Sequence, residues 1–509
     1  MTETSEKPEK IVEKRTDIEN FRIKIHEESF DFTGVTFKCE IDFSRRKFTN
    51  VVFTDAIFEK AVKFDKAEFL NLSSFQRAQF YGNTTFNNTK FLDEVDFTEA
   101  KFNNYVDFSL AKFNKHIYFR NNVFNGDVRF VDTTFVGLVD FTEVDFNGLC
   151  HFYRAKFDGD CYFYDVTFSK HVSFKEVQFP KEVYFTGVTF SFHAFFTNAV
   201  FNGIVNFAQV IFSNIADFNN CQFLGTSSFS LSHFNGKTQF LNVHFVKEAI
   251  FRSTQIYGDT DFSKSQFDDN AYFNNIFAKG QNMVNFSLAT FNKNVDFNNG
   301  NIDNSLFKSV LFNKPANFTG STLNATDFTG AIFLQYGIFS GCEMNIANRE
   351  TFRIIKHQLK KIDNRIDALN FHKKEMQVYR NELCVGEGYK KYFELFILYM
   401  NRISNDYGLN WARGILFTFI AAVVFFIPYL LFLQDSYFTW GWQGFTSFWN
   451  VTDKTIKYFI EFLYAAHQFD FMEQYKPGGL AYVFDLIGRI FIAFGYYQTI
   501  QAFRKYGKW

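Results

Sequence analysis

Proline and cysteine are scarce in this chain, and the familiar sequence signatures of catalysis are missing. The 509 residues include only 5 Pro and 6 Cys, and no two cysteines have the CxxC spacing of a zinc or redox site. The sequence contains no GxGxxG after a strand, no GxxxxGK[ST], no HExxH and no GxSxG. The 10 His are scattered without spaced metal-binding partners. We therefore predict a protein that is not an enzyme and that holds no cofactor and no metal.

An excess of charge of one sign is also missing. The chain has 53 Lys and Arg against 54 Asp and Glu, a net charge of −1 at pH 7, so bulk charge indicates neither nucleic acid nor an acidic substrate. Residues 1–30 are charged and lack the apolar core of a secretory signal, and we predict a polar tail or cap there. Cys150, Cys161 and Cys221 stand where neighbouring repeats carry other small residues, which indicates buried thiols in a reducing compartment.

Phenylalanine is what the chain has in abundance, with 78 copies. From Phe58 to Phe273 it recurs at alternating steps of five and six residues, and the one slot without it holds Ile256. These steps do not return to one face of a helix, which excludes an α-helical repeat. A small or β-branched residue stands two positions before most Phe, as Ala67 does, so on an extended chain both face one interior. This structural ladder begins with Phe58, Phe64, Phe69, Phe75, Phe80, Phe86, Phe91 and Phe97.

The six-residue steps often have Gly two positions after Phe, as at Gly126, Gly148 and Gly203. We expect these glycines to take positive φ and to absorb the extra residue as a corner or bulge. The single step of 13, between Phe273 and Phe286, predicts a larger bulge or loop.

The units resemble pentapeptide repeats, in which each unit has a large apolar centre and a small residue two positions before it. The likeness is closest at residues 324–328 (NATDF) and 329–333 (TGAIF), and it covers residues 31–345. The resemblance implies an all-β, right-handed quadrilateral β-solenoid, here with Phe where the family mostly has Leu and with coils of about 22 residues. About 14 coils at a strand spacing of ~4.8 Å give a rod of roughly 65–70 Å.

Some members of that family imitate duplex DNA and bind topoisomerases. An equal length of duplex carries about 40 phosphate charges, whereas residues 31–345 have a net charge of only about −5. The sequence therefore disfavours DNA mimicry, and it disfavours nucleic acid as a partner.

Residues 346–386 change to a helical pattern. Asn348 is a capping residue, and apolar residues such as Phe352 and Ile355 follow at spacings of three and four. Asp363 and Asn364 fall midway and favour a helical neck that folds as a hairpin. Such a neck would cap the open end of the solenoid or form an oligomerising or partner-docking surface.

Residues 387–509 contain the long apolar runs. We predict membrane spans over residues 413–433 and 480–503 and an interfacial amphipathic helix over 389–404. Residues 434–479 would form a loop with a short helix. Lys391 and Arg413 precede the first span, and Arg504 and Lys505 follow the second. The positive-inside rule then predicts an integral protein of a bacterial inner membrane, with the solenoid and both termini cytoplasmic.

The second span carries polar and small residues. Asp485 and Arg489 are four apart and form a candidate intramembrane pair, for which a plain local pair near the interface is the simpler interpretation. Small residues along one face let a helix approach another helix or subunit closely. This candidate helix-packing seam consists of Gly488, Ile492, Gly495, Thr499 and Ala502.

Two functional hypotheses follow. The first is a membrane-anchored scaffold or sensor whose solenoid binds a protein partner of unknown identity. The second is an oligomeric two-span channel or pore gated by the solenoid, in which Asp470 and Glu473 of the loop would form acidic rings. The order of span, short helix, loop and span is typical of two-span channels, but no Thr-Val-Gly-Tyr-Gly filter is present. We favour the scaffold or sensor.

Overall fold

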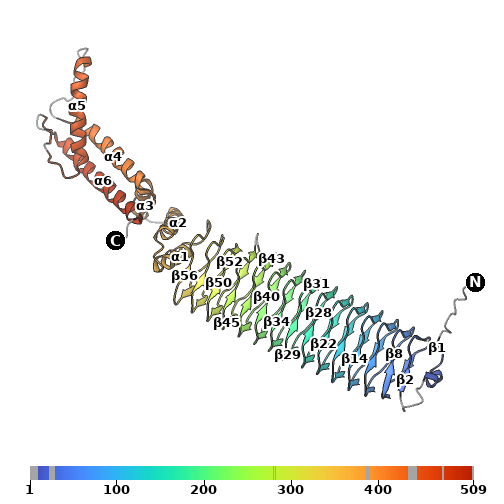
Figure 1. Cartoon of the computed structure of the whole chain (residues 1–509). Coiled ribbons are helices and arrows are strands. Elements are labelled where there is room, and N and C mark those ends of the chain that lie inside the picture. Colours follow the sequence, from blue (N-terminus) through green and yellow to red (C-terminus); the bar gives the residue numbers. More distant parts are fainter. Residues whose placement is uncertain are drawn as a thin grey trace, which may run out of the picture. The chain divides into compact units, whose positions relative to one another are not determined.

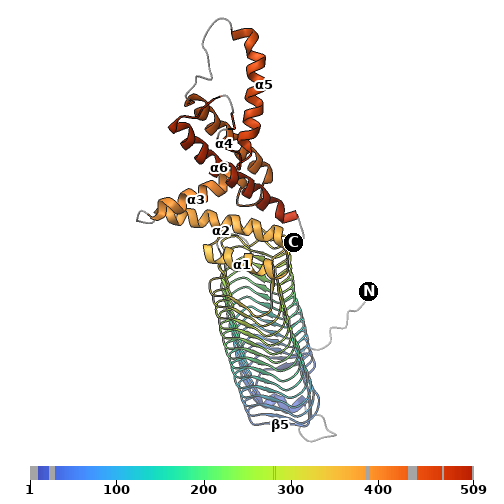
Figure 2. The same cartoon turned by 90° about the vertical axis from the view of Figure 1, so that its left-hand side faces the viewer.

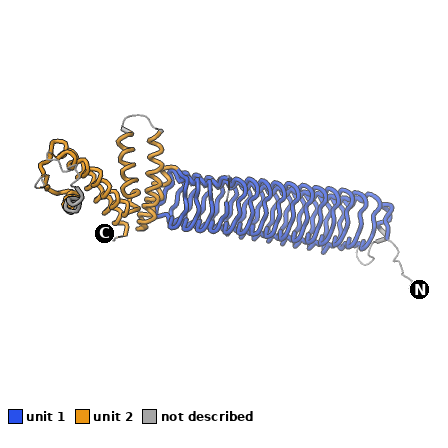
Figure 3. The backbone as a smooth tube through the Cα atoms, turned by 90° about the horizontal axis from the view of Figure 1, so that it is seen from above, with its two compact units in different colours: residues 1–347 blue, residues 348–509 orange. Residues whose placement is uncertain are grey.

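The computed structural model describes residues 10–21, 29–278, 280, 282–385, 390–433, 444–469, 471–472 and 475–506. The chain divides into two compact units, residues 1–347 and residues 348–509, which Figure 3 colours blue and orange. The first unit is built mainly from short strands, and the second is helical.

The first unit is a parallel β-solenoid. Its strands run from β1 (Lys10–Val12) to β56 (Gly337–Ile338), and the coils stack one on the next (Figures 1 and 2). One coil consists of β7 (Ile57–Phe58), β8 (Val62–Lys63), β9 (Glu68–Phe69) and β10 (Ser73–Ser74). Each strand pairs with its equivalent in the adjacent coils, giving four sheets of 13 to 15 strands over the described residues. The predicted β-solenoid of about 14 coils is confirmed, while its right-handed sense and quadrilateral cross-section stay predictions.

The solenoid begins earlier than the predicted boundary at residue 31. Strand β1 pairs with β3 (Val35–Phe37), and β2 (Ser29–Asp31) pairs with β6 (Asn50–Val52). A 3₁₀ turn, η1 (Arg15–Phe21), follows β1. Part of the predicted tail is therefore the first paired strand of the solenoid.

The length of a coil changes along the solenoid. Partners in adjacent coils are 22 residues apart over most of it, as Phe58 and Phe80 are, but the pair Phe267 and Phe291 is 24 apart. The longer coil contains the predicted bulge, yet β47 (Phe277–Ala278) stays in register there. Ala278 pairs with Ile256 on one side and with Ile302 on the other. From Ile256 onward this ladder column therefore lacks an aromatic ring, since Leu323 and Met344 follow Ile302 in it.

The Phe ladder fills the interior. The eight residues from Phe58 to Phe97 that open it are each at most 1% exposed. Phe64 stacks on Phe86 of the next coil, with ring centroids 4.7 Å apart and planes at 3°, and it meets Phe75 edge to face at 5.8 Å. Such arrangements add to the free energy of burial, which is about 1.5–3 kcal/mol for each ring. The ladder is therefore the main source of the solenoid's stability.

The left-handed residues of the solenoid lie in the five-residue steps, where some of them are glycines such as Gly187, and not at the glycines of the six-residue steps. Leu110 has φ of 61°, and its N–H donates to the carbonyl of Val131 in the next coil at 2.9 Å. Gly126 and Gly148 do not have positive φ, so the sequence expectation for these glycines was wrong. A Cβ on Gly126 would lie 2.3 Å from the carbonyl carbon of Asn104. Glycine is present there because adjacent coils approach too closely for a side chain.

Relieving the left-handed strain should stabilise the solenoid. Leu110 and Leu231 are both left-handed and about half exposed, and a non-glycine residue in this conformation costs roughly 1–2 kcal/mol. Glycine also gains entropy in the unfolded chain, so we expect Leu110→Gly and Leu231→Gly each to add about 0.5–1 kcal/mol, measured as a higher unfolding midpoint. Leu72→Gly is the matched control, because Leu72 is equally exposed but lacks positive φ. A lower midpoint for all three variants would contradict the prediction.

The second unit begins with a helical hairpin. Helix α1 (Arg349–Lys361) starts at Asn348, whose side chain accepts a hydrogen bond from the backbone N–H of Thr351 at 2.8 Å. It turns at Asp363, which has φ of 56°, into α2 (Arg365–Val385). The remaining helices are α3 (Lys390–Asn405), α4 (Trp411–Leu431), α5 (Gly444–Leu463) and α6 (Gly479–Phe503), followed by the 3₁₀ turn η2 (Arg504–Tyr506). Figure 2 shows α1, α2 and α3 packed side by side. The helix predicted between the two apolar segments is not short, since α5 has 20 residues.

Candidate functional site in the helical unit

Helices α4 and α6 pack against each other along closely approaching backbones. Both are long and apolar enough to cross a membrane. A Cβ on Gly414 of α4 would lie 3.0 Å from the Cα of Thr499, and one on Gly495 of α6 would lie 3.1 Å from the Cβ of Thr418. Small residues at such positions let two helices approach within van der Waals contact of their backbones.

The partner of the helix-packing seam is therefore a helix of the same chain. Gly495 and Thr499 face α4, and Gly488 lies against Phe425 of α4 and Phe462 of α5. The two other seam residues, Ile492 and Ala502, are fully buried. Of the two partners that the sequence left open, a helix or another subunit, the structure places α4 of this chain on the seam.

Asp485 is the centre of a buried polar cluster. It is 0% exposed, and its Oδ2 lies 2.8 Å from Nη2 of Arg489. Its Oδ1 lies 2.8 Å from Nε2 of His467. The predicted pair of Asp485 and Arg489 is thus formed, but with a third member that the sequence pattern did not indicate. His467 is 18 residues away in the chain, beyond any local helical spacing.

The hydrogen bonds of His467 require a proton between its ring and Asp485. The carbonyl oxygen of Tyr464 lies 2.7 Å from Nδ1 and can only accept, so Nδ1 carries a hydrogen. In a neutral imidazole with its hydrogen on Nδ1, Nε2 is an acceptor, and so is the facing carboxylate oxygen of Asp485. Their contact at 2.8 Å therefore requires a second proton between them. The guanidinium of Arg489 also stacks over the ring of Phe469 at 4.1 Å, which holds its charge beside the carboxylate.

A second buried polar cluster, also missed from sequence, joins α3 to α6. The Nδ2 of Asn405 donates to the carbonyl of Gln498 at 3.1 Å, and Nε2 of Gln498 donates to Oδ1 of Asn401 at 2.9 Å. Asn405 also accepts from the N–H of Gly408 at 2.9 Å, within a turn of three consecutive residues with positive φ. Asn405 and Gln498 are 93 positions apart, so no spacing rule could have paired them.

The neck hairpin holds a buried carboxylate between a lysine and a histidine. Glu375 of α2 is 4% exposed; it pairs with Lys356 of α1 and lies 3.7 Å from Nδ1 of His372. Burial raises the pKa of Glu375, but its interactions with His372 and Lys356 outweigh this effect and lower the pKa to about 2. The ionised carboxylate therefore helps to hold α1 against α2.

The stability of the hairpin should fall in acid. Because the pKa of Glu375 is lower in the folded state, its contribution is complete above its ordinary pKa of ~4.5 and is lost as the pH falls towards about 2. The size of the shift corresponds to roughly 3 kcal/mol. We expect the protection factors of residues 349–385 against amide exchange to fall over this pH range in the wild type and to depend much less on pH in Glu375→Gln. Glu382→Gln, at an exposed pair, should keep the wild-type profile, and an unchanged profile in Glu375→Gln would refute the assignment.

The other sequence candidates supply no further site. Asp470 and Glu473 lie outside the described residues and stay candidates from sequence alone. Within the described part of the chain, no group of three or more His, Cys, Asp or Glu could hold a metal ion. Cys150, Cys161 and Cys221 are buried free thiols, and burial raises the pKa of Cys150 and Cys161 well above the ordinary value.

Comparison with known families bears on the solenoid. Residues 64–112, 152–199, 196–243 and 229–276 match the model described as pentapeptide repeats (9 copies). The solenoid is a pentapeptide-repeat domain. No curated protein and no solved structure matches the chain. All the matched segments lie in the solenoid, and none lies in the helical unit.

Proposed function

We propose that the chain is a non-enzymatic, membrane-anchored scaffold or sensor. In this proposal α4 and α6 cross a bacterial inner membrane, while the pentapeptide-repeat domain and both termini lie in the cytoplasm. The observation that carries the proposal is the exposure of the two helices. Only 39% of the apolar 18-residue segment of α4 and 28% of that of α6 is buried, whereas a core helix of a soluble protein would be mostly buried.

The exposed side chains are large and apolar. On α4 they include Ile415, Leu416, Phe419, Ile420, Val424, Ile427 and Leu431, and on α6 Leu480, Val483, Leu486, Ile490, Tyr497 and Ile500. An apolar surface of this extent on adjacent helices is unfavourable in water and suits lipid tails. Helix α3 adds exposed aromatic residues such as Phe393 and Phe396 beside Lys391, which suits a helix lying in the membrane interface.

Charges at the helix ends support the orientation. Arg402 and Arg413 lie at or before the start of α4, and Arg504 and Lys505 follow α6. All of them belong to one side of the proposed membrane, and an excess of Lys and Arg favours the cytoplasmic side.

The scaffold is favoured over the pore because the unusual residues of α6 are satisfied within one chain. The helix-packing seam meets α4, and Asp485 is bonded to Arg489 and His467. A pore made from two-span subunits needs several copies, and neither feature is left free to join them.

Labelling of native Cys384 would test the membrane topology. Cys384 is an exposed thiol of α2, so a membrane-impermeant maleimide should label it in permeabilised cells and not in intact ones. Lys457→Cys, on the exposed surface of α5, should be labelled in intact cells. The wild-type chain should also resist extraction from membranes at alkaline pH. Extraction, or labelling of Cys384 in intact cells, would overturn the proposed topology.

Ion conductance and partner binding separate the scaffold from the pore. We expect liposomes that contain the purified chain to show no ion conductance. We also expect deletion of residues 1–345 to remove the protein partners found by proximity labelling without loss of membrane insertion. Conductance that depends on Asp470 or Glu473 would instead favour the channel.

A further inference from the structure

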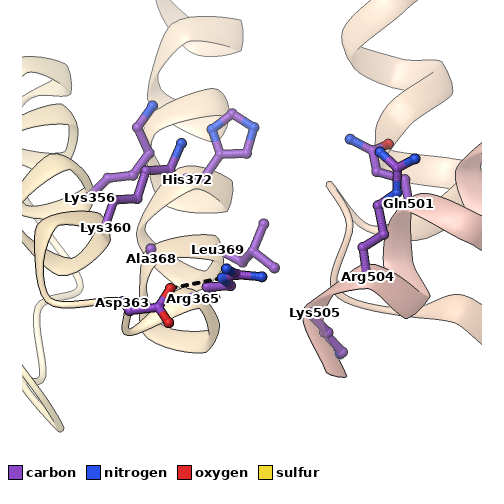
Figure 4. A pocket seen from close by; sticks show the side chains of 10 residues that line it. All are labelled: Lys356, Lys360, Asp363, Arg365, Ala368, Leu369, His372, Gln501, Arg504 and Lys505. Carbon is purple, nitrogen blue, oxygen red and sulfur yellow. Dashed lines mark hydrogen bonds and ion pairs between the residues drawn. The ribbon is translucent and has the colours of Figure 1, made fainter. Parts of the chain in front are cut away.

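A pocket of about 560 Å³ lies between the neck hairpin and the C-terminal end of α6. Figure 4 shows its two walls, with side chains of α1 and α2 on one and Gln501, Arg504 and Lys505 on the other. This volume lies within the range of small-molecule sites in proteins. The pocket shares none of its residues with the helix-packing seam or with the Asp485 cluster.

Positive charge dominates the lining. Five cationic side chains and one carboxylate line the pocket, the cations being Lys356, Lys360, Arg365, Arg504 and Lys505. The carboxylate of Asp363 pairs with Arg365 at 2.9 Å, and Lys356 pairs with Glu375. Lys360 and Arg504 are exposed, and neither forms an ion pair within the described residues. The two walls thus bring uncompensated cations to one cavity, which attracts an anion.

The two walls are linked through α3 and the turn after it. Lys373 of α2 pairs with Asp406 at 2.7 Å, and Asp406 lies 3.8 Å from Arg413 of α4. Asn405, the last residue of α3, donates to the carbonyl of Gln498 of α6. The pocket is therefore bounded by elements that hydrogen bonds and ion pairs hold together.

Helix dipoles offer a simpler reason for some of these cations. Lys360 is in the last turn of α1, and Arg504 follows the last residue of α6, where positive charge is favourable. The dipole accounts for each cation by itself. It does not account for Arg365 at the start of α2, where a cation is unfavourable; there Arg365 pairs with Asp363, and both line the same cavity.

We infer that this pocket binds a phosphate-bearing ligand. Guanidinium and ammonium groups are the side chains that recognise phosphate oxygens, and the Gln501 amide adds a neutral donor. The phosphate could belong to the headgroup of an anionic phospholipid, because the end of α6 would lie at the cytoplasmic membrane surface. It could equally belong to a soluble phosphorylated molecule. The lipid source rests on the proposed membrane function, whereas the soluble source does not. In either case, the bound ligand would bridge the neck hairpin and α6.

The test is a titration of the full chain in neutral detergent with two probes. One is dihexanoyl phosphatidylglycerol, with dihexanoyl phosphatidylcholine as its zwitterionic match, and the other is inorganic pyrophosphate. The double variant Lys360→Gln/Arg504→Gln should weaken binding at least tenfold, because it removes from the pocket the two exposed cations without an ion-pair partner in the described residues. Arg353→Gln/Arg402→Gln, which removes two exposed cations outside the pocket, should bind as the wild type does. Helical circular dichroism checks that both variants are folded.

Each outcome decides a different point. Selective binding of phosphatidylglycerol assigns a lipid headgroup, and binding of pyrophosphate alone assigns a soluble ligand. Absence of binding by both probes, or an equal loss in both double variants, would overturn the inference. Pyrophosphate binding by a chain that is extracted from membranes at alkaline pH would keep the pocket and reject the membrane function.

Discussion

Replacing Phe174 with alanine should destabilise the coils around it by about 3–5 kcal/mol, the usual cost of removing a buried aromatic ring. Phe174 is 0% exposed. It stacks on Phe152 at 4.8 Å and on Phe196 at 5.0 Å, and it meets Phe163 and Phe185 edge to face. Alanine would leave a cavity that the stiff stack of rings cannot close. The loss would therefore include both the transfer free energy and the contacts of four neighbouring rings.

Amide exchange followed by mass spectrometry can locate this effect. Coils of a solenoid contact only their neighbours, so protection in Phe174→Ala should fall most in the coils around residue 174 and recover with distance. Phe192→Ala makes the same chemical change at a ring that is 44% exposed, and it should cost less than about 1 kcal/mol. Equal effects of the two substitutions would mean that the ladder is not the main source of stability.

Asp485→Ala should destabilise the helical unit by a similar amount. The substitution removes the carboxylate from Arg489 and His467, whose side chains are only 17% and 4% exposed. Breaking a buried ion pair by removing one partner costs about 3–5 kcal/mol, because an uncompensated charge stays behind. Unfolding in detergent, followed by helical circular dichroism, would measure the loss.

A double variant tests the reason for this loss. Asp485→Ala/Arg489→Ala removes both opposite charges, so it should be more stable than Asp485→Ala alone. Glu382→Ala breaks an exposed pair with Arg349 and should change stability by less than about 1 kcal/mol. If the double variant were no more stable than Asp485→Ala, the loss would not come from stranded charge.

The solenoid could be predicted from the sequence because its repeat depends only on residues that are close together in the chain. Alternation along an extended chain and a period of five and six residues are enough to place Phe64 and Phe86 in one stack. The same reasoning was wrong about Gly126, because the lack of a side chain permits both a positive φ and a close approach of two backbones. Only the distance to Asn104 of the preceding coil separates these two uses of glycine.

The helical unit was predicted less completely. Asp485 and Arg489 lie one turn apart on a helix, so their spacing indicated the pair. His467, which follows the end of α5, contacts Asp485. Asn405 contacts Gln498, which is 93 positions away in the sequence. Such contacts depend on how the helices pack against one another. The sequence indicates that packing only where small residues such as Gly495 mark a close approach of two helices. The basic pocket was likewise invisible, because it joins cations of the neck to those that follow α6.

The ladder column through Ile256, Ala278 and Ile302 makes the pentapeptide-repeat domain mechanically uneven. In the coils before Ile256 a ring in this column stacks on the ring of the next coil, as Phe58 does on Phe80. From Ile256 onward the column has no ring, because it continues through Ala278, Ile302, Leu323 and Met344. A tension applied along the axis should therefore separate the coils after Ile256, which are joined by three columns of stacked rings, before the coils ahead of it, which are joined by four.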